Sequence, residues 1–293
     1  MKKILRSAPL VQAVIHLRFS ETPSLSIIDS KLLKTIHAQM INLGFPDFIE
    51  STAQSVEFTV DQSSQEVKQR TQTMKRYVFI AAGKTESIEL NSTSLIIKST
   101  NYNTFEELSQ SFLSAINLCL ETVNELQKML LKSIGLRYVN AIVPKGSNNL
   151  ESLISKEIIP LSTVSISNSR HLHGSMSKAI ETDNNQSMLI NFEELPLNGT
   201  SVHKILPENS IEPDTNCGLV IKGYSWWANV PGNTYGILDI DHSYNFNSPQ
   251  FDMGLVESEL FKLKQNISSV FWELTSDTAK NAWDYEEINN DME

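Results

Sequence analysis

The chain has 293 residues, of which 40% are hydrophobic and 20% are charged, and its formal net charge is −10. This length allows one large domain or two of ordinary size, and the composition is that of a globular protein. A membrane-spanning helix needs about 18 uninterrupted apolar residues, which the sequence does not contain, and the acidic balance excludes a strongly basic nucleic-acid footprint.

The amino terminus and the two cysteines favour a cytoplasmic location. The lysine pair at residues 2–3 resembles the start of a secretory signal, but Arg6 and Arg18 interrupt the apolar stretch and no small-residue cleavage pattern follows. Cys119 lies within a helical pattern and Cys217 opens a predicted strand. Both fit buried free thiols of a reducing compartment.

The negative charge is concentrated in the second half of the chain. Residues 1–133 carry 14 Lys and Arg against 13 Asp and Glu, whereas the remainder carries 10 against 21. Residues 284–293 hold five acids and no base. We expect these last ten residues to form an acidic, solvated tail, with docking on a basic partner as the alternative.

The first half begins with a strand at residues 11–19, in which apolar side chains alternate with polar ones. A helix with one apolar face follows and ends at Gly44, where ordinary stop chemistry occurs. The polar residues 61–72 form either a long hairpin loop or extended hairpin arms. Thr104 starts a capping box, and we predict that its amphipathic helix continues to about Lys132. Further strands of this half are expected at residues 56–60, 77–81, 87–90 and 95–98.

The second half is less regular. Its first strand, at residues 136–143, has apolar residues on both faces, which predicts a central position in a sheet. A short helix follows at residues 150–154, an insertion rich in Pro, Asn and Gly spans 194–216, and an amphipathic helix spans about 254–274. The other strands are expected at residues 163–166, 171–180, 188–192, 219–227 and 235–242.

One short sequence motif, which we call the repeated phrase, occurs twice: as VIHLRF at residues 14–19 and as SIGLRYV at residues 133–139. Each copy opens a run of strand, helix, several strands and a long helix. This predicts an α+β fold with two pseudo-repeats, residues 1–133 and 134–283, that form one curved antiparallel sheet backed by two long helices. The element order is similar to that of each half of the TATA-binding-protein saddle and to a helix-grip topology, but element order carries no function.

Three motifs point to a known family. They are LRF at residues 17–19, GLRYVN at 135–140 and VFWELT at 270–275. With them the chain resembles a sporadically distributed family of bacterial and archaeal proteins of roughly this length, which has no assigned activity. The resemblance implies mobile or defence-associated genes and says nothing about chemistry.

The best candidate metal-binding site combines His171 and His173 with Asp239 and Asp241. Residues two apart on a strand share a face, so each pair could point the same way. Together they would offer nitrogen and oxygen ligands suited to Zn, Mn or Fe. The site requires the two strands to be neighbours in register. Two solvated sheet faces are the alternative.

Arg18 and Arg137 occupy matching places in the two phrases. Near a pseudo-twofold axis they could clamp a phosphate or carboxylate, with Asn140 and Tyr138 in the same strand joining them. They could also serve the fold, because a buried Arg needs carboxylate or carbonyl partners.

Trp226 and Trp227 belong to a predicted hairpin. Because neighbouring strand residues face opposite sides, one of the two should be exposed and available for a partner contact. The sequence contains no GxSxG, GxGxxG or GxxxxGK[ST] motif, so the common nucleophile and phosphate-loop signatures are lacking.

We therefore expect a non-catalytic binding or regulatory protein of a bacterial phage-defence or toxin–antitoxin-like cassette. It would hold a partner protein or a small ligand on the open sheet face or in the groove between the repeats, without a cofactor. A metal-dependent hydrolase is the first alternative. Nucleic-acid binding through the near-neutral first half is the second, although nucleic acid is not the expected partner.

Overall fold

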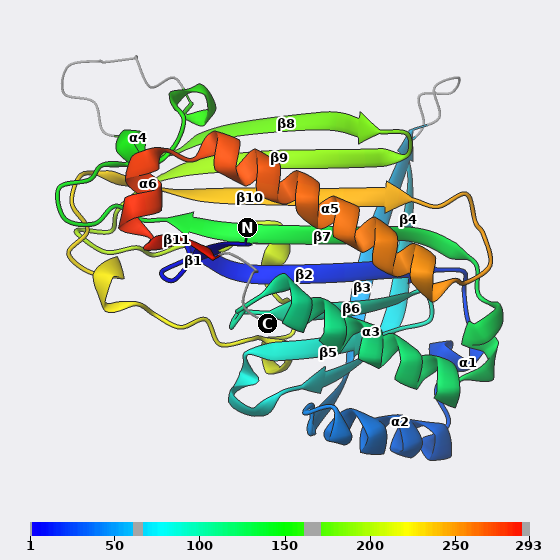
Figure 1. Cartoon of the computed structure of the whole chain (residues 1–293). Coiled ribbons are helices and arrows are strands. Elements are labelled where there is room, and N and C mark those ends of the chain that lie inside the picture. The colour runs from blue at the N-terminus through cyan, green and yellow to red at the C-terminus, as the bar shows by residue number, and fades with distance from the viewer. Residues whose placement is uncertain (1, 61–66, 161–170, 289–293) are drawn as a thin grey trace.

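The computed structural model describes residues 2–60, 67–160 and 171–288, and these form two antiparallel sheets with helices (Figure 1). The strands of the large sheet are β2 (Leu10–Phe19), β3 (Asp47–Val60), β4 (Val67–Ile80), β5 (Glu86–Leu90), β6 (Ser94–Ser99), β7 (Leu131–Ile142), β8 (Gly174–Asp183), β9 (Gln186–Pro196) and β10 (Thr234–Asn245). The small sheet pairs β1 (Lys2–Leu5) with β11 (Tyr285–Ile288). The helices are α1 (Pro23–Ser26), α2 (Ser30–Asn42), α3 (Phe105–Thr122), α4 (Leu150–Leu153), α5 (Met253–Leu274) and α6 (Asp277–Ala282).

The repeated phrases lie side by side at the centre of the large sheet. Its strand order is β3-β4-β5-β6-β2-β7-β10-β9-β8. In each half the first strand is central, the last strand lies beside it, and the others continue outward. The register pairs His16 with Gly135, so that Ile15 faces Leu136 and Leu17 faces Ile134. The two phrases therefore pair with each other about the His16–Gly135 position, and the predicted α+β architecture is confirmed.

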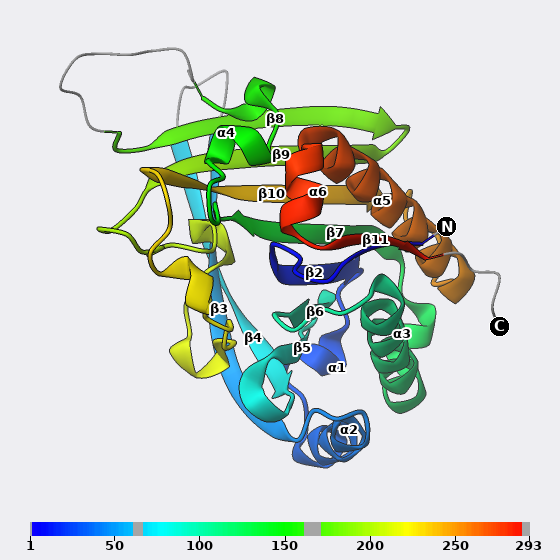
Figure 2. The ribbon, with the colours of Figure 1, turned by 60° about the vertical axis from the view of Figure 1, so that its left-hand side comes forward.

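The main core lies between the sheet and its helices. Alternate residues of the central strands, such as Ile15, Leu17 and Leu136, are buried beneath α3 and α5. Figures 1 and 2 show both long helices on this side, which we call the helix face. No helix in the described residues is long and apolar enough to cross a membrane.

The opposite side of the sheet, which we call the rear face, is not open as expected. The arms of the β3–β4 hairpin are long, because each strand has 14 residues. Both views show these arms crossing the rear face (Figures 1 and 2). Backbone strand structure up to Val60 and from Val67 favours extended hairpin arms over a long loop.

The chain between β9 and β10, residues 197–233, is longer than the predicted insertion at 194–216, and we call this whole segment the insertion from here on. Part of it also lies over the rear face. Residues 209–214, called the strap here, reach strands of both halves. Asn209 accepts a hydrogen bond from Arg137 of β7 at 2.7 Å, and Asp214 accepts one from Ser51 of β3 at 2.5 Å.

Several predicted elements differ from the structure. Residues 284–293 were expected to form a solvated tail, but Tyr285–Ile288 form strand β11, which pairs with β1. Helix α3 ends at Thr122 rather than near Lys132, and a 3-10 turn at Asn124–Lys128 leads into β7. Leu126 continues the helical spacing but is buried by the turn, so apolar spacing alone could not separate the two. The strand predicted at residues 219–227 is wrong, because the only regular element there is a 3-10 turn at Ser225–Trp227. The strand predicted at residues 163–166 lies outside the described residues.

Gly236 is required by the packing of the helix face. A Cβ at this position would lie 2.6 Å from two ring atoms of Phe192, which is fully buried. We predict that Gly236→Ala lowers the free energy of unfolding by about 1–3 kcal/mol through overpacking, measured by urea denaturation.

Gly135→Ala is the matched control, because its Cβ would meet the nearest atom at 3.7 Å, an ordinary contact. It should unfold like the unmodified protein, within about 0.5 kcal/mol. Adding Phe192→Leu should recover part of the stability lost in Gly236→Ala. Equal midpoints for the two glycine variants would contradict the steric explanation.

Candidate ligand-binding site

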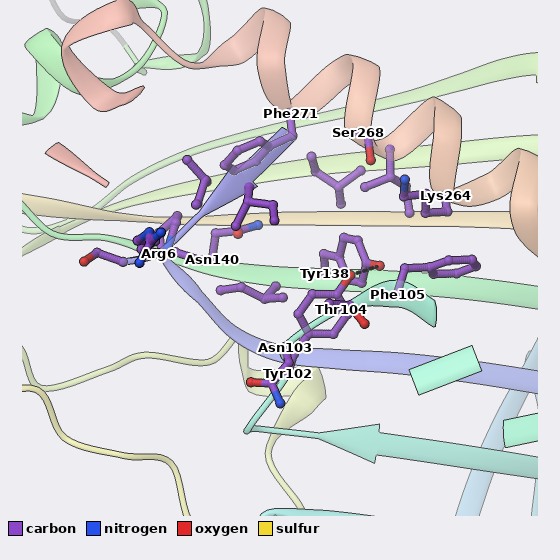
Figure 3. Close-up of a pocket in the computed structure, with 18 of the residues that line it drawn as sticks. Arg6, Tyr102, Asn103, Thr104, Phe105, Tyr138, Asn140, Lys264, Ser268 and Phe271 are labelled. Atoms are coloured by element: carbon purple, nitrogen blue, oxygen red, sulfur yellow. Dashed lines mark hydrogen bonds between the residues drawn. The ribbon is translucent and has the colours of Figure 1, made fainter. Parts of the chain in front are cut away.

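A cavity of about 860 Å³ lies on the helix face between elements of the two halves (Figure 3). Its floor is formed by β7 and β10, and its walls by the start of α3, the second half of α5 and the segment after β1. Representative lining residues are Arg6, Leu10, Tyr102, Phe105, Tyr138, Asn140, Lys222, Ile240, Lys264, Ser268 and Phe271. A cavity of this size is within the range of small-molecule sites.

Two tyrosines from different halves meet in this cavity. The hydroxyls of Tyr102 and Tyr138 lie 3.0 Å apart and form a hydrogen bond, and their rings pack edge to face. Burial raises the pKa of Tyr102 to about 12, and burial together with Tyr102 raises that of Tyr138. Both hydroxyls therefore stay neutral near neutral pH. One of the two hydroxyl protons forms the hydrogen bond between the tyrosines, and the other can be donated to a ligand oxygen.

Asn140 adds an amide group to the cavity floor. The residue is only 3% exposed, and its Nδ2 donates to the carbonyl of Leu238 at 3.3 Å. This is the only hydrogen bond of its side chain among the described residues. The amide has further donor and acceptor capacity, and a ligand entering this partly apolar cavity is a suitable partner for it.

The cavity is basic although the protein is acidic. Arg6, Lys222 and Lys264 line it, and within the described part of the chain Glu106 is the only acidic residue that does so. Lys264 lies over the ring of Phe105, with its Nζ 5.9 Å from the ring centroid. Lys222 donates to the side-chain oxygen of Asn101 at 3.0 Å. Neither lysine is neutralised there by a carboxylate among the described residues, whereas Arg6 pairs with Glu286 at 2.9 Å.

Of the predicted contact residues, Asn140 lies in this cavity and both arginines lie elsewhere. Arg137 is on the rear face, where its Nε and one terminal nitrogen each lie 2.7 Å from a carboxylate oxygen of Asp239. Asp239 is 2% exposed, so this bidentate pair compensates a buried charge. Arg18 is exposed and pairs in register with Ser133. The two arginines do not form a clamp, because they lie on either side of the His16–Gly135 position.

The two tryptophans lie in the insertion. Trp227 packs against the smaller core cluster around Val139 and Tyr235 and contacts Tyr224 edge to face. It serves the fold at least in part. The side chain of Trp226 lies outside the described ones.

The predicted metal ligands do not come together. Strand β9 separates β8 from β10, and His171 and His173 precede the first residue of β8. His173 lies 3.7 Å from Glu193, while Asp239 is held by Arg137. In the described part of the chain, no group of three His, Cys, Asp or Glu residues is placed to hold a metal ion.

Sequence reasoning missed a charge network on the rear face. Arg76, which is 4% exposed, contacts Glu212 of the strap at 2.8 Å and Glu89 at 3.3 Å. Lys98 contacts Glu212 at 3.1 Å. Strands were predicted at residues 77–81, directly after Arg76, and at residues 95–98, which include Lys98. Nothing in the sequence indicated that Glu212, more than 100 residues away, would lie over these two side chains.

Sequence reasoning also missed Tyr102, Lys222 and Lys264 of the cavity. Tyr102 lies two residues before Thr104, where the predicted capping box begins, so its place near the start of a long helix was available as a signal. Lys264 lies within a predicted amphipathic helix, but its neighbours depend on how that helix crosses the sheet. Lys222 lies in the segment that was wrongly predicted as a strand, residues 219–227, and no local pattern pointed to its place in the cavity.

No model of a known protein family matches the chain. A search of curated proteins also gives no match. The resemblance to a sporadically distributed family therefore stays a prediction.

His16, at the centre of the rear face, should make stability depend on pH. Burial lowers the pKa of His16 from 6.5 to about 4, and the charges of Arg18 and Lys98 act in the same direction. Between these values the unfolded chain binds a proton that the folded protein does not. Stability should thus fall as the pH drops from about 6.5 to about 4, by about 3 kcal/mol at most.

The measurement is the free energy of unfolding at several pH values for the unmodified protein and for His16→Gln. The variant should lose much of the slope in this window. A part should remain, because burial also lowers the pKa of His242. An unchanged slope in His16→Gln would show that His16 is protonated in the folded state.

Proposed function

We propose that the protein is a non-catalytic binding or regulatory protein whose cavity between the two halves holds a small molecule with an anionic group and an apolar body. The observation that carries this proposal is the basic lining of an 860 Å³ cavity in a protein of net charge −10. General electrostatics would give this protein a negative field. Cationic residues gathered around one cavity therefore favour selection of an anion at that place.

The lining also defines the rest of the ligand. Phe105, Ile240 and Phe271 supply apolar surface, and such surface favours an aromatic or aliphatic body by about 25 cal/mol for each Å² buried. The hydroxyl pair of Tyr102 and Tyr138 and the amide of Asn140 add neutral hydrogen-bonding groups. They can orient a ligand but have no raised reactivity, which supports binding rather than catalysis.

The arrangement of these groups suits a regulatory role. The cavity takes Tyr102 and Phe105 from the first half and Tyr138 and Lys264 from the second, so a bound molecule would contact both. It would also contact Lys222 and Tyr224 of the insertion, the segment that carries the strap on the rear face. A ligand could thus stabilise the relative position of the first half, the second half and the insertion. We propose that it would affect the binding of a partner protein in this way.

We predict that Lys264→Gln weakens binding of anionic ligands about 10- to 100-fold, because a hydrogen bond to a charged group contributes about 1.5–3 kcal/mol. The test compares aromatic and alkyl carboxylates and phosphates with their neutral amides and alcohols, by thermal shift and then by calorimetry. The acids should bind and their neutral counterparts should bind far more weakly.

Lys34→Gln is the matched control, because Lys34 is exposed on α2 and does not line the cavity. It should bind the same acids as the unmodified protein. Neutral compounds that bind as tightly as the acids, or equal losses in Lys264→Gln and Lys34→Gln, would refute the anionic assignment.

A further inference from the structure

A second, smaller hollow of about 400 Å³ lies on the rear face at the junction of the two halves. Residues of β2, β6, β7 and β10 line its floor, and the strap, Glu89 of β5 and the β3–β4 hairpin at Ala53 and Arg76 border it. It is on the opposite side of the sheet from the basic cavity, since Arg137 and Asp241 alternate with Tyr138 and Ile240 along their strands.

Most charged groups around this hollow are paired with each other. Arg76 and Lys98 contact Glu212 and Glu89, at distances between 2.8 and 3.6 Å. Arg137 forms an ion pair with Asp239, which does not itself line the hollow. These pairs leave no net charge for a ligand to compensate.

Asp241 is the exception among the charged groups. Its carboxylate lines the hollow and makes no hydrogen bond or ion pair within the described residues. Burial, with the neighbouring charge of Asp239, raises the pKa of Asp241, and Arg137 only partly offsets this effect. A half-buried carboxylate without a partner is costly unless a cation approaches it.

His16 is a second group without a hydrogen-bonding partner among the described residues. Its ring is neutral above about pH 4, so it offers a nitrogen acceptor rather than a positive charge. Opposite His16 in the register stands Gly135, which leaves the floor of the hollow without a side chain. Val14, Ile96 and Ile211 add apolar surface to the walls.

We propose that this hollow binds a linear alkyl diamine or polyamine. One ammonium group would pair with Asp241, a second donor would bond to the His16 ring, and the methylene chain between them would lie over Gly135 and against the apolar walls. The two acceptors lie on strands separated by two strand spacings, about 10 Å. That separation suits an extended molecule with a donor at each end better than a compact cation. This inference does not depend on the basic cavity.

The experiment is calorimetric titration of the full chain with putrescine and with spermidine at low and at physiological salt. One molecule should bind per chain. Asp241→Asn should weaken binding at least tenfold. Its far-ultraviolet circular-dichroism spectrum and its melting temperature should stay close to those of the unmodified protein.

Three further variants separate the possible outcomes. Gly135→Leu should abolish binding by filling the hollow without changing any charge, and Gly135→Ala serves as the check that this position accepts a side chain. Glu208→Gln, which removes a carboxylate that is 90% exposed, should have no effect. Lys264→Gln should also leave amine binding unchanged, so failure of the anionic-ligand proposal and failure of this one can be told apart.

Two results would overturn the inference. Several amines bound per chain, with the same loss in Asp241→Asn and in Glu208→Gln, would indicate nonspecific attraction to an acidic protein. Binding that persists in folded Gly135→Leu and Asp241→Asn would place the amine outside this hollow.

Discussion

The antiparallel pairing of β2 with β7 is the interaction on which the rest of the structure depends. It joins the two halves into one sheet and sets which side of every central residue faces the helices. With His16 opposite Gly135, Ile15 and Leu136 enter the same core. Because side chains alternate along a strand, a slip of one residue would move these apolar side chains to the rear face and bring Arg137 under the helices. The apolar alternation of both phrases therefore fixes the register, and the register fixes the two faces.

This division of faces explains why neighbouring residues of β7 have different roles. Tyr138 and Asn140 form the floor of the basic cavity, whereas Arg137 points to the rear face and holds Asp239. The insertion is the element that reaches both sides. Its strap contacts Arg76 and Arg137 on the rear face, and further along Lys222 enters the cavity on the helix face. A molecule bound on either side would contact the same segment.

The sequence was informative where local patterns decide the structure. The alternation in the two phrases predicted central strands, and the stripe of apolar residues predicted α5 almost to its observed ends. Prediction from the sequence failed at Leu126, because a helix and a 3-10 turn can both bury a residue with that spacing. It also failed in the insertion, where the apolar residues have no regular spacing. Of the candidate ligand-binding site, only Asn140 and Tyr138 were singled out, because they lie in a recognisable strand. Lys222 and Lys264 meet them through the crossing of α5 over the sheet and the path of the insertion, and neither is encoded in a local pattern.

The buried charges give a physical reason to separate structural from functional groups. Arg76, Arg137 and Asp239 are almost fully buried or held in bidentate contact, and removing one partner of such a pair costs about 3–5 kcal/mol. Pairing is therefore what allows these residues to exist in the fold, and it leaves them little capacity for a ligand. Among the described residues, the amide of Asn140 on the helix face keeps unused hydrogen-bonding capacity beside the basic cavity, and the carboxylate of Asp241 and the ring of His16 keep theirs beside the hollow on the rear face. Both proposed ligands are directed at groups of this kind, because the buried charges of Arg76, Arg137 and Asp239 are already paired within the fold.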